Sequence, residues 1–477
     1  MMKVFLFVSF FLLIISSTSG QQVDKKRVVV LTDIEADPDD TQSLVRFLLY
    51  SNEIDIEGII ATTSCWMTDR VNPESISKVL NAYEKIHPNL LKHHSEFPQT
   101  EKLYALVKEG LPKYGMEGVG EGMDSEGSDW IIKILEKEDE RPLWISIWGG
   151  SNTLAQALYN IKKTKNEKEA ERLISKLRVY AISDQDDSGI WIRNNFPHLF
   201  YIVSPGDDYG NATWTGISAS YIKGIDHSKI GNSWIAENIQ QNHGPLGAIY
   251  PDVAWSVEGD TPAFLSLIPN GLNNSENPNW GGWGGRYELF IPDFSKVKEG
   301  HSIVKCVPET RPIWTNAIDS YTPYVPNEYG RTIKLDTNNF TGFKTTLWRW
   351  RDDFQNDFAA RMDWCTHSFA NANHPPAPVL NHKDIIQIKS GDSFQLNASN
   401  STDPDGDSLS FLWFLYPEAG TFKGEFKLGQ PENSNILNVV APKVSTPATI
   451  HIILKVTDKG SPSLSRYKRV ILNIDPE

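Results

Sequence analysis

The sequence predicts two folded units: an α/β domain whose mostly parallel open sheet has helices on both faces, and a smaller all-β sandwich of the Ig-like kind. Two observations support this prediction. Between residues 28 and 205, short runs of β-branched and other apolar residues alternate with segments of helical periodicity, which is typical of βαβ units. Beyond the proline-rich stretch Asn373-His-Pro-Pro-Ala-Pro378 the apolar residues recur at every second position, which indicates strands with one buried face. We therefore expect domains over residues 21–372 and 373–477.

The length, charge and amino-terminal segment limit the possible classes of function. The chain has 477 residues, too many for one hydrophobic core. Its first 20 residues resemble a secretory signal peptide, with Lys3, an apolar stretch and a small-residue end, so we expect a secreted or periplasmic protein. The net charge of −14 argues against a nucleic-acid or anionic-membrane partner, and no other stretch is long enough for membrane insertion. Three cysteines allow at most one disulfide, and Cys306 with Cys365 is favoured because Cys65 lies near the predicted site.

The strands expected in the first domain each end in a polar loop. They cover residues 28–31, 56–61, 143–148, 177–182 and 199–203. Helices are expected from Asp39 or Thr41, over 130–136 with Ser128 or Asp129 as cap, over 154–161, over 348–364 and, irregularly, over 73–111. Because ligands of open α/β sheets bind at the carboxyl ends of the strands, the loops after the strands should hold the site.

The loop after the first strand is unusually acidic. Five of its eight residues are Asp or Glu, namely Asp33, Glu35, Asp37, Asp39 and Asp40. Crowded carboxylates repel one another unless a cation or shared protons offset the charge, and oxygen ligands favour a hard cation such as calcium or magnesium. Capping of the next helix explains only one or two of the five acids. The loop therefore predicts a metal or catalytic site.

The strand-Asp-loop-Asp-Asp-helix unit from Thr32 to Asp40 resembles the beginning of the nucleoside hydrolases. Together with the segment from Asn52 to Thr63, it is most similar to a secreted "cellulose-binding" family, which has a nucleoside hydrolase-like domain followed by a C-terminal Ig-like domain. The resemblance implies a nucleoside hydrolase-like fold for the first domain. It also implies that Ca²⁺ is the cofactor and that an activated water attacks a glycosidic carbon.

Two later segments extend the resemblance and complete the implied calcium site. Gly149-Gly-Ser-Asn152-Thr is similar to the Gly-rich turn whose backbone carbonyl ligates calcium in the family, and Glu258-Gly-Asp260 is similar to the segment with the last calcium ligand. The resemblance thus implies Asp33, Asp40, Asp260 and the Asn152 carbonyl as metal ligands. It implies Asp33 and Asp39 as the catalytic residues, one of which takes a proton from the bound water. Read alone, the Gly-rich turn is better explained as an ordinary turn capped by Asn152 or Thr153.

The sequence also departs from the family pattern. Asp33 and Asp39 are six positions apart, two more than usual, so either the loop bulges or Glu35 takes the position at the strand end. Gly259 stands where many nucleoside hydrolases place a His that assists the departing base. Metal binding therefore carries over to this chain better than nucleoside specificity does.

The family's ribose-binding Asn and Glu have no counterpart after the fourth strand. Asp186 and Asp187 are the nearest substitutes, and we expect Asp187, together with Asp37, to contact the substrate.

Asn279-Trp280-Gly-Gly-Trp283-Gly-Gly-Arg286 is the most unusual run of the middle segment. Trp280, Trp283 and Arg286 are candidate substrate-binding residues, because aromatic faces presented from a loop can stack on sugar rings. Alternatively, both Trp side chains plug the domain and the glycines allow close packing. The sequence supports the two interpretations about equally.

Two functions follow from these observations. The first is a calcium-dependent hydrolase of N-glycosyl or O-glycosyl bonds with a carbohydrate-related substrate. The second is a non-catalytic protein that binds cellulose or another polysaccharide on a nucleoside hydrolase-like scaffold. Both predict a glycoside or polysaccharide as partner, and an oligomer is possible.

Overall fold

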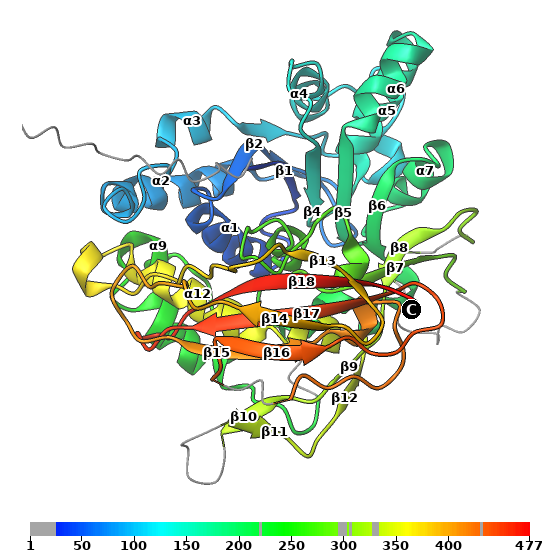
Figure 1. The fold of residues 1–477 in the computed structure, drawn as a ribbon. Helices are drawn as coiled ribbons and strands as arrows, with labels where there is room; N and C mark the ends of the chain where they lie inside the picture. Colours follow the sequence, from blue (N-terminus) through cyan, green and yellow to red (C-terminus); the bar gives the residue numbers. More distant parts are fainter. Residues whose placement is uncertain (1–24, 219–221, 294–302, 305–307, 327–332, 430–432) are drawn as a thin grey trace, which may run out of the picture.

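The computed structural model describes residues 25–218, 222–293, 303–304, 308–326, 333–429 and 433–477 (Figure 1). The predicted signal peptide and Cys306 lie outside the described residues. Cys365 is buried, and its Sγ donates to the carbonyl of Arg361.

An eight-stranded sheet organises the first domain, in the order β3-β2-β1-β4-β5-β6-β8-β7. Adjacent strands of the sheet pair in parallel, except that β7 runs antiparallel to β8. The strands are β1 (Lys26–Thr32), β2 (Ile54–Ala61), β3 (Val107–Glu109), β4 (Leu143–Ile147), β5 (Leu177–Ser183), β6 (Phe200–Ser204), β7 (Tyr287–Phe290) and β8 (Ile313–Asn316). The predicted mostly parallel sheet is confirmed, and three strands that the sequence did not predict extend it at its edges.

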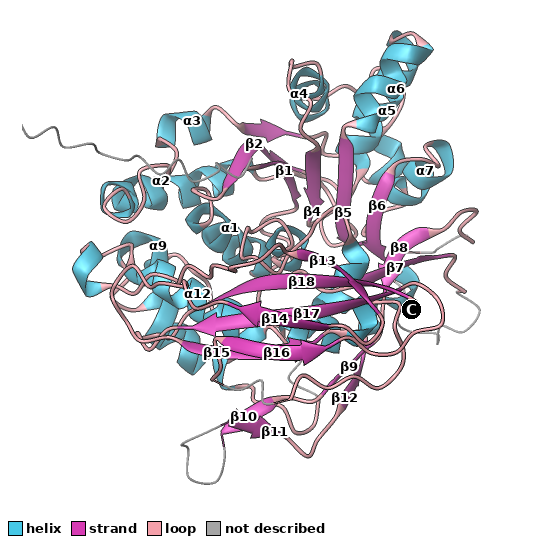
Figure 2. Cartoon of the chain, in the orientation of Figure 1, coloured by secondary structure: helices cyan, strands magenta, loops and turns pink. Residues whose placement is uncertain are grey.

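Helices pack against both faces of this sheet (Figure 2). Alternate residues of β1 belong to different cores: Val28 and Val30 pack with α1, whereas Val29 and Leu31 pack with α5. The α-helices of this domain are α1 (Asp39–Leu49), α2 (Pro73–Leu90), α3 (Thr100–Tyr104), α4 (Glu126–Leu135), α5 (Asn152–Thr164), α6 (Glu167–Ser175), α7 (Ser188–Asn195), α8 (Asn232–Ile235), α9 (Gly244–Ala248), α10 (Pro262–Leu265), α11 (Thr345–Trp348) and α12 (Arg351–Asp363). Burial on both faces explains why the strands read as continuous apolar runs.

Several helix boundaries differ from the sequence prediction. Helix α4 begins earlier than expected, because Ser125 and Ser128 form a reciprocal capping box in which Ser125 is the cap. The helix expected over 348–364 is two helices, α11 and α12. The irregular stretch 73–111 contains α2, α3 and the edge strand β3.

The C-terminal part is built from strands, with one short 3-10 helix, Pro417–Ala419, among its described residues. A four-stranded sheet has the order β13-β18-β17-β15, and a second sheet pairs β14 with β16. One apolar core contains residues of both sheets, among them Leu396, Trp413 and Leu472. The strands are β13 (Ile385–Lys389), β14 (Ser393–Asn397), β15 (Ser410–Leu415), β16 (Ile436–Val440), β17 (Ala448–Thr457) and β18 (Ser465–Asp475). The predicted α/β domain followed by a β domain is therefore confirmed.

The two domains share an interface, which we call the interdomain contact, between α12 with its neighbouring loops and the sheet of β17 and β18 (Figure 1). Tyr416, Ile453 and Tyr467 of the C-terminal part belong to the same apolar core as the first domain. The backbone nitrogen of Tyr467 also donates to the carbonyl of Asn270, 2.9 Å away. The β domain is thus packed into the first domain rather than connected only by a linker.

Buried ion pairs run through the interdomain contact. Asp357 of α12 accepts from Nη1 of Arg466 at 2.6 Å and from Nε of Arg361 at 3.1 Å. Asp353, one turn earlier, accepts from Nζ of Lys455 at 2.6 Å and from the hydroxyl of Tyr467. Each buried carboxylate of α12 is therefore neutralised by side chains of β17 or β18.

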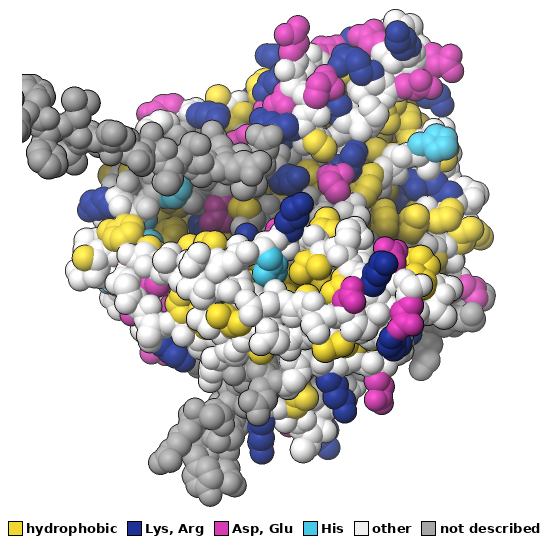
Figure 3. All heavy atoms as spheres, viewed as in Figure 1, with side chains coloured by type: hydrophobic (Ala, Val, Ile, Leu, Met, Phe, Trp, Pro, Cys, Tyr) yellow, Lys and Arg dark blue, Asp and Glu magenta, His cyan; other side chains and the backbone are white. Residues whose placement is uncertain are grey.

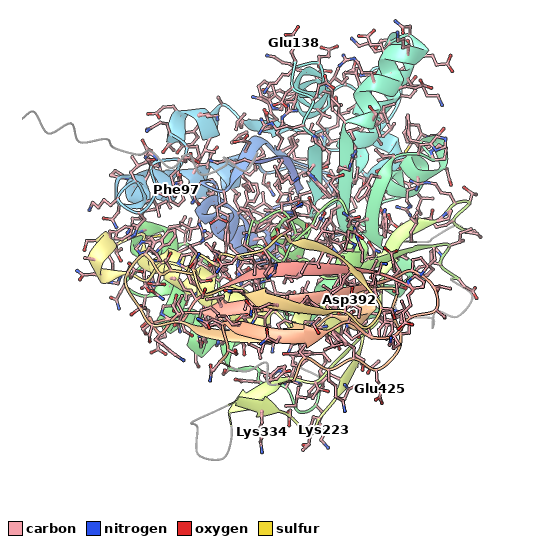
Figure 4. The ribbon with its side chains drawn as sticks, in the orientation of Figure 1. Phe97, Glu138, Lys223, Lys334, Asp392 and Glu425 are labelled. Atoms are coloured by element: carbon pink, nitrogen blue, oxygen red, sulfur yellow. The ribbon has the colours of Figure 1, made fainter. Side chains whose placement is uncertain are left out.

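Charged and apolar side chains are distributed unevenly over the surface. Figure 3 shows acidic and basic side chains concentrated over α4 and α6, whereas the strand-rich face below is largely uncharged. Glu138, just beyond α4, lies at the end of the molecule opposite Lys334, a residue of the hairpin strand β11 (Ile333–Leu335), which pairs with β10 (Tyr324–Pro326) (Figure 4). A second short hairpin pairs β9 (Asp319–Tyr321) with β12 (Phe340–Gly342). Over the described residues, no helix combines the length and apolarity that crossing a bilayer requires.

Candidate active site

The acidic loop connects the carboxyl end of β1 to the first turn of α1. Asp33 follows the strand directly and is 2% exposed, whereas Glu35 is exposed with a φ of 78°. The turn closes where the backbone nitrogen of Ala36 donates to the carbonyl of Asp33. The two extra residues are therefore absorbed by a bulge at Glu35, and Asp33 keeps the position at the strand end.

Neighbouring strands hold Asp33 and Asp40 in place. The hydroxyl of Thr32, the last residue of β1, donates to Oδ1 of Asp40. Gly149 lies beside Asp33, and a Cβ at this position would be only 2.6 Å from Oδ1 of Asp33. The Gly-rich turn after β4 is thus required for close approach of the backbone to the acid.

A distant segment brings Asp260 to the same place. The backbone nitrogen of Gly259 donates to Oδ2 of Asp39 over 3.2 Å, and the hydroxyl of Thr261 meets that of Ser43 at 3.0 Å. Asp260 is 2% exposed, and its Oδ2 has no hydrogen-bond partner among the residues that the structure describes. A buried acceptor without a donor is costly unless a ligand satisfies it.

We call the acids of this cluster the site carboxylates. Each of them either has a raised pKa or, through its charge, raises the pKa of a neighbour. They are Asp33, Asp37, Asp39, Asp40 and Asp260. Burial, opposed by a hydrogen bond from Ser64, raises the pKa of Asp33 to about 6. Burial is the largest cause that raises the pKa of Asp39, Asp40 and Asp260 well above the usual value. The charges of the other site carboxylates raise it further, and Asp39 also shares a hydrogen bond with the side chain of Asp37. The site carboxylates therefore repel one another when they are ionised.

The donor set fits a hard cation. Carboxylate oxygens of Asp37, Asp39 and Asp40 lie within 4.8 Å of one another, and Oδ2 of Asp260 lacks a donor. Calcium takes six to eight oxygen ligands, largely from carboxylates and carbonyls. The residues present therefore match the chemistry of Ca²⁺.

Asn152 links the Gly-rich turn to the neighbouring loops through its side chain. Its Nδ2 donates to Oγ1 of Thr63 at 3.0 Å and to the carbonyl of Lys113 at 2.7 Å. Its backbone nitrogen donates to Oδ2 of Asp186 at 3.2 Å. Asn152 opens α5 at the same end of the sheet as Asp33, and the ligand role of its carbonyl stays a prediction.

Asp186 and Asp187 diverge after β5. Asp186 is fully buried, accepts from the backbone and hydroxyl of Ser188, and has its pKa raised by burial to about 6. Asp187 is exposed, and its Oδ1 accepts from the backbone nitrogen of Met116 at 2.8 Å. The carboxylate of Asp187 thus secures a neighbouring loop, and its role as a substrate contact stays a prediction. Asp186 is the acid directed toward the Gly-rich turn.

The Trp-Gly run lies in the interdomain contact rather than in an open loop. Trp283 is fully buried, with its ring 6.2 Å from that of Phe354 and 6.4 Å from that of Tyr467. Trp280 packs edge-on against His451 of β17 at 5.0 Å. A Cβ at Gly281 would collide with the hydroxyl of Tyr416. The plug interpretation is therefore correct for Trp283, which has no open face for a sugar.

Arg286 also has a structural position. It is 2% exposed, and its Nε donates to Oδ1 of Asp319 at 2.6 Å while Nη2 donates to the carbonyl of Ile318. Asp319 in turn accepts from the hydroxyl of Tyr416 at 2.7 Å. The prediction that Arg286 binds substrate is wrong, because its guanidinium is committed to this buried network.

Sequence reasoning missed three aromatic residues close to the site carboxylates. Trp66 lies in the loop after β2, and Tyr209 and Trp214 lie in the 3-10 helices Gly206–Asn211 and Thr213–Ile217 after β6. The ring centroid of Tyr209 lies 6.3 Å from that of Trp66 and 5.2 Å from that of Trp214. The signal that could have found them is their place in loops after strand ends, where open α/β sheets bind ligands.

Two family models match the chain. "Cellulose-binding Sde182, nucleoside hydrolase-like domain" matches residues 27–287, and "Cellulose-binding protein Sde0182, C-terminal domain" matches residues 393–474. No curated protein gives a match.

One solved structure is similar over nearly the whole chain. It is a nucleoside hydrolase-related protein from Saccharophagus degradans that is associated with carbohydrate metabolism, with 37% identity, a TM-score of 0.78, and coverage of 95% of this chain and 100% of that one. The effector protein XOO4466 is 11% identical over 60% of this chain and 89% of its own, with a TM-score of 0.29. The type III effector XopQ, solved with adenosine diphosphate ribose, is 13% identical over 61% of this chain and 90% of its own, also with a TM-score of 0.29. The last two likenesses are too weak to support an argument.

Proposed function

The chain belongs to the family of cellulose-binding proteins with a nucleoside hydrolase-like domain, as its resemblance predicted, and from this premise we propose that it is a calcium-dependent hydrolase of glycosyl bonds. The bond is N-glycosyl or O-glycosyl, and the substrate is carbohydrate-related. The association of the Saccharophagus protein with carbohydrate metabolism supports this substrate class.

One observation carries the proposal. Oδ2 of Asp260 is buried without a donor, and it belongs to a group whose pKa is raised first by burial and then by the charges of Asp39 and Asp40. A purely structural acid would be paired, because an unpaired buried charge is strongly destabilising. The unsatisfied oxygen and the shared repulsion are both explained by a bound cation.

The proposed ligands are Asp33, Asp40, Asp260 and the carbonyl of Asn152. Bound there, Ca²⁺ would supply positive charge that lowers the pKa of a neighbouring water. Asp33 and Asp40 are fixed for this role by Gly149 and Thr32, respectively.

Asp39 and Asp33 are the proposed proton acceptors. Asp39 is half-buried and accepts from the backbone nitrogen of Gly259, and burial followed by a hydrogen bond with the carboxyl of Asp37 raises its pKa, which favours uptake of a proton from a water. A carboxylate positioned beside the attacked carbon also stabilises the oxocarbenium-like transition state of glycosyl hydrolysis. Asp37, whose Oδ1 accepts from the backbone nitrogen of Asp39, is half-buried at the edge of the cluster, where it could contact a sugar hydroxyl.

The departing group is handled differently from that of nucleoside hydrolases with a His at position 259. A Cβ on Gly259 would be 2.6 Å from Oδ2 of Asp39 and 3.0 Å from the ring of Trp214. No side chain therefore fits there, and Trp214 occupies the adjoining space. This difference supports a substrate other than a common nucleoside.

The absence of a side chain at Gly259 also favours a second candidate function, non-catalytic binding of cellulose or another polysaccharide. In that case the site carboxylates and their cation would only hold the loops together. The two functions differ in whether Asp39 is needed for turnover.

Calorimetric titration of the mature protein with Ca²⁺ tests the metal site. Wild type, Asp40→Asn and Asp260→Asn are compared with Glu35→Gln, a matched control that removes one exposed carboxylate from the same loop. We expect binding in wild type and in the control, and its loss in both site variants. Binding that survives in both, or that is absent from wild type, would contradict the proposed site.

Turnover of glycosides and nucleosides then separates the two functions. In the calcium-loaded protein, Asp39→Asn should lower kcat by about 100-fold or more, the usual contribution of a general base. Calcium binding without turnover of any glycoside would instead favour the binding protein.

We further propose that the protein is exported through its first 20 residues. Mass spectrometry of the protein recovered outside the cytoplasm should give a mature chain that begins near Gln21. An intact amino terminus would contradict this proposal.

A further inference from the structure

A row of aromatic rings leads from the surface to the site carboxylates. Trp66 is 54% exposed, Tyr209 is half-buried, and Trp214 is 5% exposed. The centroid distances of 6.3 Å and 5.2 Å place each ring in contact with the next. The row thus has an outer, a middle and an inner member, and burial increases along it.

The inner end of the row is fixed beside Asp39. Nε1 of Trp214 donates to the hydroxyl of Ser183 at 3.2 Å, which orients the indole. Its ring lies 3.0 Å from the position that a Cβ of Gly259 would take, and the same position is 2.6 Å from Oδ2 of Asp39. The inner end of the row therefore adjoins the proposed proton acceptor across Gly259.

The outer member of the row, Trp66, is not explained by the packing of a core, whereas Tyr209 is partly buried against the core of the first domain. Trp66 exposes more than half of its surface although it adjoins Tyr209, and a large aromatic side chain stabilises a fold chiefly through the area that it buries. Trp283, which plugs the interdomain contact, shows what a structural Trp of this chain looks like, since it is fully buried. An exposed ring beside a functional site is typical of a ligand-contacting residue.

The orientation of the rings limits the kind of ligand. Trp66 and Tyr209 are inclined by 55° to each other, and Tyr209 and Trp214 by 59°. Three rings inclined in this way do not form one plane, so they do not match the flat face of crystalline cellulose. A single flexible chain can change direction from ring to ring.

We propose that Trp66 and Tyr209 stack on successive sugar rings of a single glycan chain, with Trp214 supporting Tyr209, and that the row directs the chain end to Asp39. The ligand is a soluble oligosaccharide or a free polysaccharide end with apolar pyranose faces, such as a β-linked glucan. The binding itself does not require catalysis, whereas cleavage of the bound chain end rests on the proposed function.

A second aromatic surface offers the competing location. Phe422 and Phe426 line a cavity of about 250 Å³ in the β domain, together with Leu415 and His451. If glycan binding resided in the β domain, this cavity would be its place. It lies outside the row, so one variant there distinguishes the two locations.

Calorimetry with cello-oligosaccharides of increasing length tests the row on the full-length mature protein. We compare wild type with Trp66→Ala, Tyr209→Ala, Tyr209→Phe and Phe422→Ala. Loss of one stacked ring should weaken binding about tenfold, which corresponds to about 1.4 kcal/mol. Tyr209→Phe keeps the ring and should bind like wild type, and Phe422→Ala should do the same. Because Trp66 is exposed, its variant should fold normally, as its thermal unfolding will show.

Repeating the titration in chelator and with Asp39→Asn separates this inference from the proposed function. Binding that depends on Trp66 but is never followed by cleavage would leave the row intact and overturn the hydrolase. Affinity unchanged in both Trp66→Ala and Tyr209→Ala, or lost only in Phe422→Ala, would overturn the row. Retention of wild type on microcrystalline cellulose with no affinity for soluble oligosaccharides would overturn it as well.

Discussion

Buried acids occur both in the site and in the interdomain contact, but their pKa values are shifted in opposite directions. In the interdomain contact, burial alone would raise the pKa of Asp357, but Arg466 and Arg361 hold it at about 2. In the site, burial raises the pKa of Asp33 to about 6, and the neighbouring carboxylates raise that of Asp260 further than burial does alone. Buried acids therefore indicate a functional site only where no basic side chain neutralises them and a bound ligand must supply the positive charge.

The largest effect should come from breaking a pair in the interdomain contact. Asp357→Asn removes the carboxylate that Arg361 and Arg466 share and leaves the two buried guanidinium groups with only Glu53 as counter-charge, so we expect a loss of about 3–5 kcal/mol in the free energy of unfolding. Asp352→Asn on the same helix is the control, because its carboxylate is 64% exposed and the change should cost under about 0.5 kcal/mol. Chemical denaturation measures both, and equal effects would refute the structural role of the pair.

Loss of an aromatic side chain should likewise cost more unfolding free energy in the interdomain contact than beside the site. Trp283→Ala removes a fully buried ring and should cost about 3 kcal/mol or more of unfolding free energy. Trp66→Ala removes a half-exposed ring and should cost far less, about 0.5 kcal/mol. If thermal denaturation showed a comparable cost for Trp66→Ala, that ring would be structural and the contrast would fail.

Acid should weaken the interdomain contact in two stages. His451 is held neutral, because burial and then Arg469 lower its pKa to about 3, so its contribution to stability is complete above pH 6.5 and is lost as the pH falls from there toward 3. Asp357 contributes fully above its ordinary pKa of 3.8, and about 2 kcal/mol is lost as the pH falls toward 2. Protonation of the site carboxylates, whose pKa values are raised, acts in the opposite sense, so the two losses are measured from pH 7 downward as differences in unfolding free energy from a variant that lacks the group. The first loss should vanish in His451→Gln, and its persistence there would assign it to another group.

Local pattern was sufficient where a feature depends on neighbours in the chain. The apolar run of β1, the acids of the following loop and the Gly-rich turn were all predictable, because strand burial, carboxylate crowding and backbone approach are recorded in short segments. The bulge at Glu35 was one of two alternatives, and only the structure decides between them.

Features that depend on distant packing could not be predicted. Whether Trp283 faces solvent is decided by the docking of β18, and Arg286 is buried by its ion pair with Asp319 of β9; neither partner is recorded in the residues around Trp283 and Arg286. Tyr209 and Trp214 lie in short 3-10 helices without periodicity, so only their place after the end of a strand pointed to them. Strands β7 and β8 join the sheet only through pairing with β6 and with each other.

The central claim is that the site carboxylates are arranged for a cation, and the unfolding free energy of Asp260→Asn tests it most directly. The account predicts a reversal of sign. In chelator the variant should be more stable than wild type by about 1 kcal/mol, because one of several repelling charges is removed. With calcium at about a hundredfold its Kd, wild type should gain about 2.7 kcal/mol that the variant lacks, and so become the more stable protein. A variant that is less stable than wild type in chelator, with no further change on adding calcium, would contradict the account.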